Sequence, residues 1–315
     1  MADGNRDIDA GAARSAARRL PSAEQGTSGA PPAVSIVIPT FRRQQRLPLC
    51  LEWIARCRGA ERAEIIVIDQ TPVSEWLPID ERITNRFYSI ERLHASVPNI
   101  AAARNRGGMI ASAKLLLFLD DDVELESDFL IRLLALFERD VLDVTGSVLV
   151  DSFAAERVAG CGIEPVTWLP GANTAVRHKH FLAVGGYDEN MPRYNEDAEF
   201  CHRLRLSGLR IGRHTGLRAI HHDERSGGTW QCVSLLDTAR DVMFSDLYFR
   251  RAIGGGLLAI IWQAFRTIRH EWKGFGRIKA GTIPGRILAC GVMAPVACVA
   301  AYRKPKTLPA CRSRS

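Results

Sequence analysis

The 315-residue chain lacks any C-x-x-C pair, and its eight cysteines are scattered from Cys50 to Cys311. This spacing argues against a zinc module or a disulfide framework and fits reduced thiols in a cytosolic protein. The N-terminal region has no apolar segment typical of a signal peptide, and its early aspartates argue against a transit peptide. With 46% hydrophobic and 24% charged residues, the chain is expected to form a cytoplasmic protein with an ordinary hydrophobic core.

Acidic residues are almost absent from the end of the chain. Residues 250–315 contain thirteen lysines and arginines and one acid, Glu271, which gives this segment a formal charge of +12. Subtracting this charge from the total of +7 leaves −5 for residues 1–249. The basic character therefore belongs to the tail, and the sequence does not predict a basic face for nucleic acid.

The tail also lacks an unbroken apolar run. Its longer apolar stretch, residues 283–302, is interrupted by two prolines, two glycines and an arginine, whereas a spanning helix needs about 20 apolar residues. Apolar helices flanked by basic residues are typical of proteins that lie on an anionic membrane. We predict that residues 231–315 are helical and contact the inner face of the cytoplasmic membrane. Packing of this region on the core or in an oligomer interface is the alternative.

The folded part is predicted to begin after residues 1–33, which are poor in large apolar side chains and should be disordered. Residues 34–38 form an apolar run that ends at Pro39, and residues 64–69 form a second run that ends in an aspartate. Between them, apolar positions at helical spacing predict one helix face: Leu47, Leu51, Ile54 and Cys57. This strand, helix, strand order predicts a doubly wound, mostly parallel α/β sheet.

The most informative stretch is residues 115–122, in which five apolar residues precede Asp120, Asp121 and Asp122. The apolar run predicts a strand buried on both faces, and ligands bind at the carboxyl edge of such sheets. Three adjacent carboxylates require a compensating cation, and oxygen ligands suit Mg²⁺ or Mn²⁺ with a diphosphate completing the shell. The alternative is that Asp121 or Asp122 caps a helix at residues 129–139.

A further helix is predicted at residues 99–112, capped by Asn99 and carrying Arg104 on its first turns. Arg104 would be placed to meet a phosphate group, or it would be an ordinary solvated arginine.

Several segments, in this order and spacing, resemble the signature of family 2 glycosyltransferases, which have the GT-A fold. They are residues 34–40 (VSIVIPT), 65–70 (IIVIDQ), 101–107 (AAARNRG), 118–123 (FLDDDV), 171–173 (GAN), 184–188 (VGGYD) and 195–197 (NED). The resemblance covers about residues 33–225 and predicts a GT-A catalytic domain at residues 34–230, followed by the helical basic extension.

The resemblance implies sugar transfer from a nucleoside diphosphate donor with inversion, and it assigns roles by position. Asp197 matches the carboxylate that serves as catalytic base, and residues 120–122 match the DxD-type element that contacts ribose and metal. The nucleotide-sugar-binding residues implied are Pro39, Thr40, Arg43, Asp69, Arg104, Asp120, Asp121, Asn173 and Glu196. Asp69 would accept a hydrogen bond from a uracil N–H, but Gln70 departs from the family pattern and leaves the base open. The metal ligands implied are Asp120, Asp122 and His222, with His221 as the alternative histidine.

We therefore expect a transferase dependent on Mn²⁺ or Mg²⁺ that moves a single sugar to a hydroxyl of a glycan or lipid-linked acceptor. The processive polysaccharide synthases are a poor match, because the sequence has no Q-x-x-R-W motif and no series of membrane spans. Two alternatives are a non-catalytic membrane scaffold that keeps the fold and a sugar nucleotidyltransferase. The nucleotidyltransferase would need a glycine-rich basic loop after the first strand, where the chain has Pro39, Thr40 and Phe41.

Overall fold

The computed structural model describes residues 30–150, 162–191, 193–222, 244–245 and 247–250, together with the backbone of residues 17–19. Most of the N-terminal segment 1–33 and of the basic region 231–315 therefore lies outside the described residues. The described part of the tail, residues 244–245 and 247–250, is helical. Within the described parts of the chain, we find no helix with the length and apolarity needed to cross a bilayer.

One ten-stranded mixed sheet organises the described residues, and its main path is β1-β4-β3-β2-β5-β9-β7-β10-β6, with β8 paired to β10. The strands are β1 (Ala17–Arg19), β2 (Val34–Thr40), β3 (Ala63–Asp69), β4 (Ser89–His94), β5 (Leu115–Leu119), β6 (Val123–Leu125), β7 (Val144–Leu149), β8 (Ile163–Pro165), β9 (Asn173–Arg177) and β10 (Ile211–His221). Strands β4, β3, β2 and β5 are parallel neighbours, and β7 is parallel to β10. Strand β9 lies antiparallel between β5 and β7. The expected α/β sheet is confirmed, with antiparallel strands confined to its second half and its edges.

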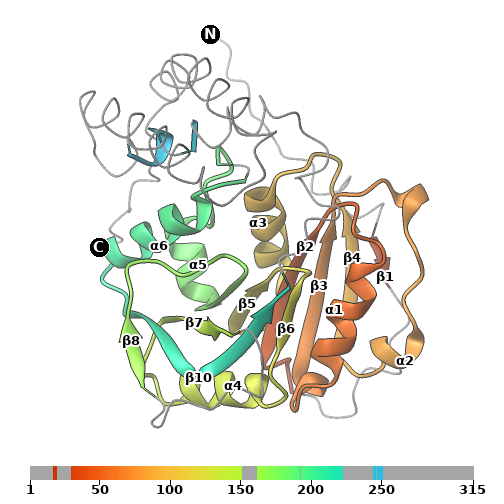
Figure 1. Cartoon of the computed structure of the whole chain (residues 1–315), viewed down its shortest axis with the longest axis horizontal. Coiled ribbons are helices and arrows are strands. Elements are labelled where there is room, and N and C mark those ends of the chain that lie inside the picture. The colour runs from red at the N-terminus through yellow and green to blue at the C-terminus, as the bar shows by residue number, and fades with distance from the viewer. Residues whose placement is uncertain are drawn as a thin grey trace, which may run out of the picture.

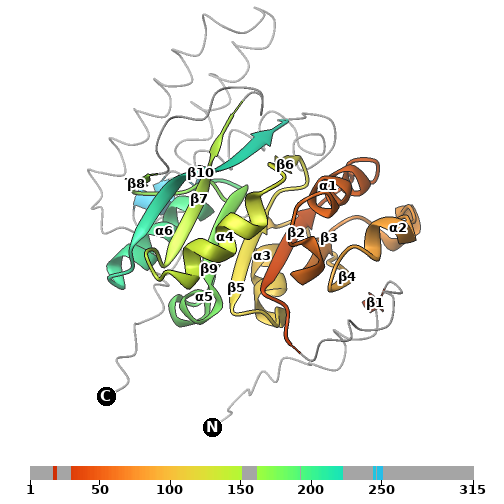
Figure 2. The same ribbon diagram turned by 90° about the horizontal axis from the view of Figure 1, so that it is seen from below.

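Helices cover both faces of this sheet (Figure 1 and Figure 2). One layer contains α1 (Arg46–Ala55), α2 (Glu81–Thr84) and α4 (Phe129–Glu138), and the other contains α3 (Ile100–Ile110), α5 (His178–Val184) and α6 (Glu196–Leu206). Two short 3₁₀ turns, η2 (Ala60–Arg62) and η3 (Val73–Glu75), flank β3. Alternate residues of each central strand belong to different cores: Ile36 and Ile38 pack with α1, whereas Val37 packs in the core that contains α3. Burial on both faces explains why these strands are continuously apolar.

Strand β2 continues through Pro39 to Thr40, so the prediction that it ends at Pro39 was wrong. Strand β5 pairs only with residues 35–37 of β2, and the missing N–H of Pro39 therefore interrupts no ladder on that side. The register places Thr40 opposite Asp69 of β3, as expected. At the other edge of the sheet, β1 pairs with β4, which contradicts the expected disorder for residues 17–19.

The three aspartates form a tight turn between β5 and β6. The N–H of Asp120 donates to the carbonyl of Ala172 at 3.0 Å, and the N–H of Val123 donates to the carbonyl of Asp120 at 3.3 Å. Helix α4 begins later, after Asp128, so the alternative that Asp121 or Asp122 caps it was wrong. The turn is instead held at the carboxyl edge of the sheet.

Helix α3 begins as predicted, because the Asn99 side chain accepts the N–H of Ala102 at 3.0 Å. Its position over the sheet depends on Gly107. A Cβ atom at this residue would lie 2.3 Å from Cγ1 of Val37, so only glycine allows this close packing on β2. The close approach brings Arg104, one turn earlier, to the edge of the sheet where the aspartates lie.

Candidate active site

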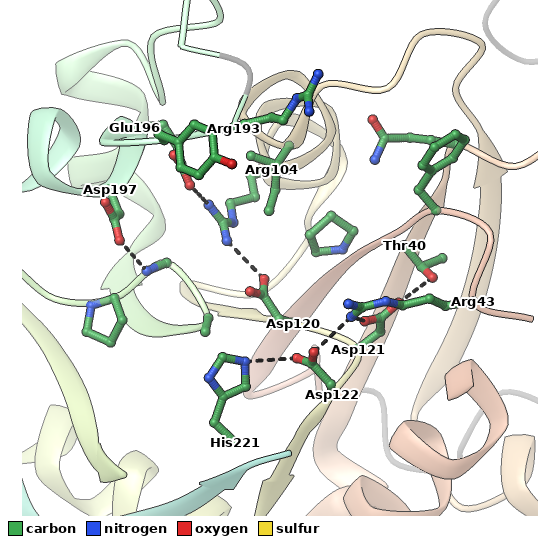
Figure 3. A pocket seen from close by; sticks show the side chains of 18 residues that line it. Thr40, Arg43, Arg104, Asp120, Asp121, Asp122, Arg193, Glu196, Asp197 and His221 are labelled. Atoms are coloured by element: carbon green, nitrogen blue, oxygen red, sulfur yellow. Dashed lines mark hydrogen bonds and ion pairs between the residues drawn. The ribbon is translucent and has the colours of Figure 1, made fainter. Parts of the chain in front are cut away.

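A cavity of about 310 Å³ opens at the carboxyl edge of β2 and β5 (Figure 3). It collects nine of the residues implied by the sequence: Pro39, Thr40, Arg43, Arg104, Asp120, Asp121, Asp122, Glu196 and Asp197. Segments more than 150 residues apart in the chain therefore meet here, from Pro39 near the end of β2 to Asp197 in α6.

Arg43 provides the positive charge beside the aspartate turn. Its Nη1 lies 2.7 Å from Oδ1 of Asp121 and 2.8 Å from Oδ2 of Asp122, and the Thr40 hydroxyl donates to Asp121 at 2.5 Å. Burial raises the pKa of Asp121 to about 6 against the opposing effects of Arg43 and Thr40. Burial acts in the same direction on Asp122, but His221 and Arg43 outweigh it and hold the pKa below its ordinary value. Asp122 is thus the more strongly ionised of these two neighbours.

Arg104 connects the aspartate turn to the start of α6. Its guanidinium donates to Oδ1 of Asp120 at 2.9 Å and to Oε1 of Glu196 at 2.8 Å, and the side chain is fully buried. The alternative that Arg104 is a solvated surface arginine was therefore wrong. A Cβ atom at Gly171 would lie 2.5 Å from Nη1 of Arg104, which explains why a glycine begins the Gly-Ala-Asn segment.

Glu196 and Asp197 occupy the first turn of α6, where the helix dipole favours negative charge. Both carboxylate oxygens of Asp197 accept backbone hydrogen bonds, from the N–H of Gly171 at 3.0 Å and from the N–H of Ala198 at 2.7 Å. Burial raises the pKa of Asp197, opposed chiefly by the Gly171 hydrogen bond. Burial also raises the pKa of Glu196 to about 7, with Arg104 opposing and Asp197 adding to the effect. Asp197 is thus a fixed carboxylate with increased proton affinity.

The structure places His221, and not His222, beside the aspartates. Nε2 of His221 lies 3.1 Å from Oδ1 of Asp122, whereas Nε2 of His222 lies 2.9 Å from Oε2 of Glu124. The His222 ring also stacks on Trp53 at a centroid distance of 4.6 Å. Successive side chains of an extended segment point to opposite sides, so only one of two adjacent histidines can face the turn. The expected assignment of His222 to the cavity is corrected to His221.

The donor atoms in the cavity suit a divalent cation in their chemistry. Asp120, Asp122 and His221 supply carboxylate and imidazole donors of the kinds that bind Mn²⁺ or Mg²⁺, and the Asp120 side chain is 24% exposed. Among the described residues, however, no three such side chains are arranged closely enough to form a metal cluster. Arg43 instead balances the charge of Asp121 and Asp122.

Besides His222, two of the residues implied by the resemblance do not line the cavity. Asp69 is completely buried and its Oδ2 lies 2.5 Å from Nη2 of Arg92, on the neighbouring strand β4. Its other oxygen accepts the N–H of Thr71 at 2.8 Å. Asn173 is buried in β9, and no described residue forms a hydrogen bond with its side-chain amide. Asp69 therefore does not line the cavity, and its carboxylate forms an ion pair with Arg92.

Sequence reasoning missed several residues that line the cavity, among them Gln70, Arg193 and Tyr194. Gln70 departs from the family pattern, which gives it no role. Its side chain accepts the N–H of Asn99 at 2.5 Å and so connects the end of β3 to the start of α3. Arg193 and Tyr194 directly precede residues 195–197, and this position was the available signal.

Comparisons with known proteins agree with this geometry. Residues 35–181 match the family model described as Glycosyl transferase family 2. Rhamnosyltransferase WbbL of Escherichia coli strain K12 is 39% identical over 64 residues, which cover 19% of this chain and 24% of that protein. Glucosyl-dolichyl phosphate glucuronosyltransferase of Haloferax volcanii is 27% identical over 215 residues, which cover 61% of this chain and 67% of that protein. The chain thus aligns with about a quarter of the first relative and two thirds of the second.

Solved structures show the same fold. Residues 1–349 of S. aureus TarS in complex with UDP-GlcNAc superpose with a TM-score of 0.55 at 16% identity, covering 86% of this chain and 89% of that chain. Mannosyltransferase PcManGT from Pyrobaculum calidifontis, in complex with GDP-Man and Mn²⁺, has a TM-score of 0.50 at 15% identity, covering 87% of this chain and 74% of that chain. Residues 35–181 therefore match the family 2 glycosyltransferase model, and the described part of the chain shares the GT-A fold of these glycosyltransferase structures.

Proposed function

We propose that the protein transfers a single sugar from a nucleoside diphosphate donor to a hydroxyl of a glycan or lipid-linked acceptor, with inversion and with a divalent metal. The observation that carries this proposal is the shared cavity, in which the aspartate turn and Asp197 are joined through Arg104 and Glu196. Groups that can hold a diphosphate and a group that can accept a proton thus line one space.

The donor half of the site is assigned to Pro39, Thr40, Arg43 and the aspartate turn. TarS in complex with UDP-GlcNAc and PcManGT in complex with GDP-Man and Mn²⁺ support a nucleotide-sugar donor and a metal. Asp120, Asp122 and His221 would hold the ion, which would stabilise the negative charge of the departing diphosphate. Arg43 pairs with Asp121 and Asp122 and Arg104 pairs with Asp120, so both arginines lie beside the aspartate turn and would bind phosphate oxygens.

Asp197 is assigned as the general base. During inversion the acceptor oxygen bonds to the anomeric carbon while the bond to the diphosphate breaks, and the hydroxyl proton must leave. A carboxylate with a raised pKa accepts this proton more readily, and the N–H groups of Gly171 and Ala198 hold Asp197 in one orientation. Glu196 would position Arg104 and would take no proton from the acceptor.

The C-terminal region is proposed to bring the enzyme to an anionic membrane, where a lipid-linked acceptor would lie. The charge of +12 in residues 250–315 supports this part of the proposal. The domain limits proposed are 34–230 for the catalytic domain and 231–315 for the membrane-associated region.

Donor binding is tested by thermal unfolding with UDP, GDP and dTDP, each with and without Mn²⁺. A ligand at 100 times its dissociation constant adds about 2.7 kcal/mol to the free energy of unfolding. We expect at least one nucleotide to raise Tm by about 5–10 °C only when Mn²⁺ is present. Met109→Ala is the matched control, because Met109 is 65% exposed and does not line the cavity.

Absence of any nucleotide effect, or an equal effect without metal, would contradict the proposal. A protein that binds donor but neither transfers nor slowly hydrolyses it would instead be a scaffold that keeps the fold.

A further inference from the structure

A second cavity of about 570 Å³ lies next to the donor cavity. The described residues that line it come from the carboxyl end of β7, from Arg213 near the start of β10, from Pro165 at the end of β8 and from residues 166–170, which follow β8. Pro170 lines both cavities. The volume lies within the range of about 300–1,000 Å³ that is typical of small-molecule sites.

Trp168 forms part of the cavity wall and is 52% exposed. An exposed indole ring in the wall of a cavity offers an apolar face that a ligand can cover. The C–H groups on one side of a pyranose ring form a flat apolar surface, and an indole ring offers a matching face together with a polar N–H at its edge. A sugar ring is therefore a suitable occupant for this wall.

Ser147 provides the second observation. It lines the same cavity and is only 2% exposed, yet its Oγ has no hydrogen-bond partner in the part of the chain that the structure describes. Buried hydroxyls nearly always form hydrogen bonds, because leaving one unmade is unfavourable. A sugar hydroxyl in the cavity would complete this bond. Arg213, whose Nη2 lies 2.8 Å from Oε2 of Glu164, adds a charged group to the lining of the cavity.

The segment that carries Trp168 also carries the hydrogen-bond donor to the proposed base. The N–H of Gly171 donates to Oδ2 of Asp197, three residues after Trp168. Because Trp168 and Gly171 are three residues apart, their Cα atoms can be at most about 10 Å from each other. Gly146 of β7 allows Leu169 of this segment to pack closely, since a Cβ atom at Gly146 would lie 2.8 Å from Cδ2 of Leu169. Sugar rings bound on Trp168 would thus extend toward Asp197.

We propose that the second cavity is an acceptor subsite, in which Trp168 stacks on a pyranose ring of the acceptor and Ser147 binds one of its hydroxyls. This inference rests on the proposed function and makes it more specific, because it identifies the acceptor as a glycan whose sugar, and not its lipid, is recognised.

The test uses full-length protein labelled with 5-fluorotryptophan and observed by ¹⁹F NMR. The Trp168 resonance is identified by its loss in Trp168→Phe, and methyl glycosides of glucose, galactose, mannose and rhamnose are titrated to tens of millimolar. We expect at least one glycoside to shift this resonance. Ser147→Ala should lower the affinity for that glycoside about tenfold, the equivalent of about 1.4 kcal/mol of binding free energy, without lowering Tm. Met109→Ala is the control, and its affinity should equal that of the wild type.

If no glycoside shifts the Trp168 resonance, or if Ser147→Ala binds as tightly as the wild type, the subsite is overturned. Nucleotide-dependent stabilisation with Mn²⁺ is measured on the same samples. If it persists when no glycoside binds, the subsite fails alone. If nucleotides have no effect while a glycoside still shifts Trp168, the proposed donor chemistry fails and the sugar site stands.

Discussion

Replacing Asp197 with asparagine removes the proposed base and also disturbs two hydrogen bonds. Both Asp197 oxygens accept backbone N–H groups, at 3.0 Å from Gly171 and at 2.7 Å from Ala198. The asparagine amide has one oxygen, so its NH₂ group must face one of these donors. Asp197→Asn is therefore not structurally neutral, and the unpaired buried N–H should lower the free energy of unfolding by about 1–3 kcal/mol.

The expected loss of activity is much larger than this loss of stability. A positioned general base contributes about 10² to 10⁴ in rate, so turnover should fall by that factor. Tm should fall by about 2–12 °C, from a dependence of about 2–4 °C per kcal/mol for a domain of this size. Donor affinity should stay unchanged, because the donor is assigned to Thr40, Arg43 and the aspartate turn and not to Asp197. The measurements are initial rates, donor affinity and thermal unfolding.

Glu196→Gln is the matched control, since it makes the same chemical change at the adjacent residue. The Glu196 carboxylate binds Arg104 at 2.8 Å and is assigned no role as proton acceptor. Glu196→Gln should therefore keep far more activity than Asp197→Asn. A fully active Asp197→Asn would refute the assignment and move the base elsewhere. A parallel loss of donor affinity would show that Asp197 binds the nucleotide or its metal.

Four further outcomes are expected. Asp122→Asn should abolish transfer and the Mn²⁺-dependent stabilisation by nucleoside diphosphate while the apoprotein still folds, and thermal shifts that match the wild type would contradict this. Gly171→Ala should lower stability by about 1–3 kcal/mol and reduce turnover, because its Cβ would lie 2.5 Å from the buried Nη1 of Arg104; denaturant unfolding with unchanged stability would argue against it. Burial raises the pKa of Glu196 to about 7 in the folded protein, above the ordinary 4.5, so the contribution of Glu196 to stability should be fully present below pH 4.5 and should decrease by about 3 kcal/mol between pH 4.5 and 7. Glu196→Gln should lack this decrease, and identical pH profiles for the two proteins would exclude it. Deleting residues 254–315 should release the protein from vesicles that contain phosphatidylglycerol while nucleotide binding survives, and a truncated protein that still pelleted or failed to fold would exclude a membrane role for this region.

Strands β2, β3 and β5 and helices α1 and α3 could be predicted from the sequence, because they depend on local burial periodicity and on a local cap. The five apolar residues of β5 are all buried, and the apolar face of α1 lies in the core as its spacing indicated. Asn99 caps α3 through a bond to a residue three positions away, which is also a local feature. The same local signals placed the aspartate turn at the carboxyl edge of the sheet.

Motif order extended the prediction from the fold to most of the cavity. Nine of the expected residues line it, and most of them stand at the end of a strand or at the first turn of a helix; Arg43 lies in the loop after β2 and Arg104 on the second turn of α3. Gly107 and Gly171 mark close contacts that a Cβ atom would prevent, but the sequence does not reveal which side chain or strand approaches them.

By itself, the sequence determined strands β2, β3 and β5, their parallel α/β arrangement and the acids that follow them, since these depend on short-range periodicity and on the residue types at strand ends. Only the tertiary structure decided the partners of those acids. Arg104 forms an ion pair with Glu196, which lies 92 positions away in the chain, and Arg92 forms one with Asp69. The side on which the last residues of β10 project places His221, and not His222, beside Asp122. Such choices arise from the packing of distant segments and from the side on which each side chain leaves its strand, and a linear pattern of residue types carries neither.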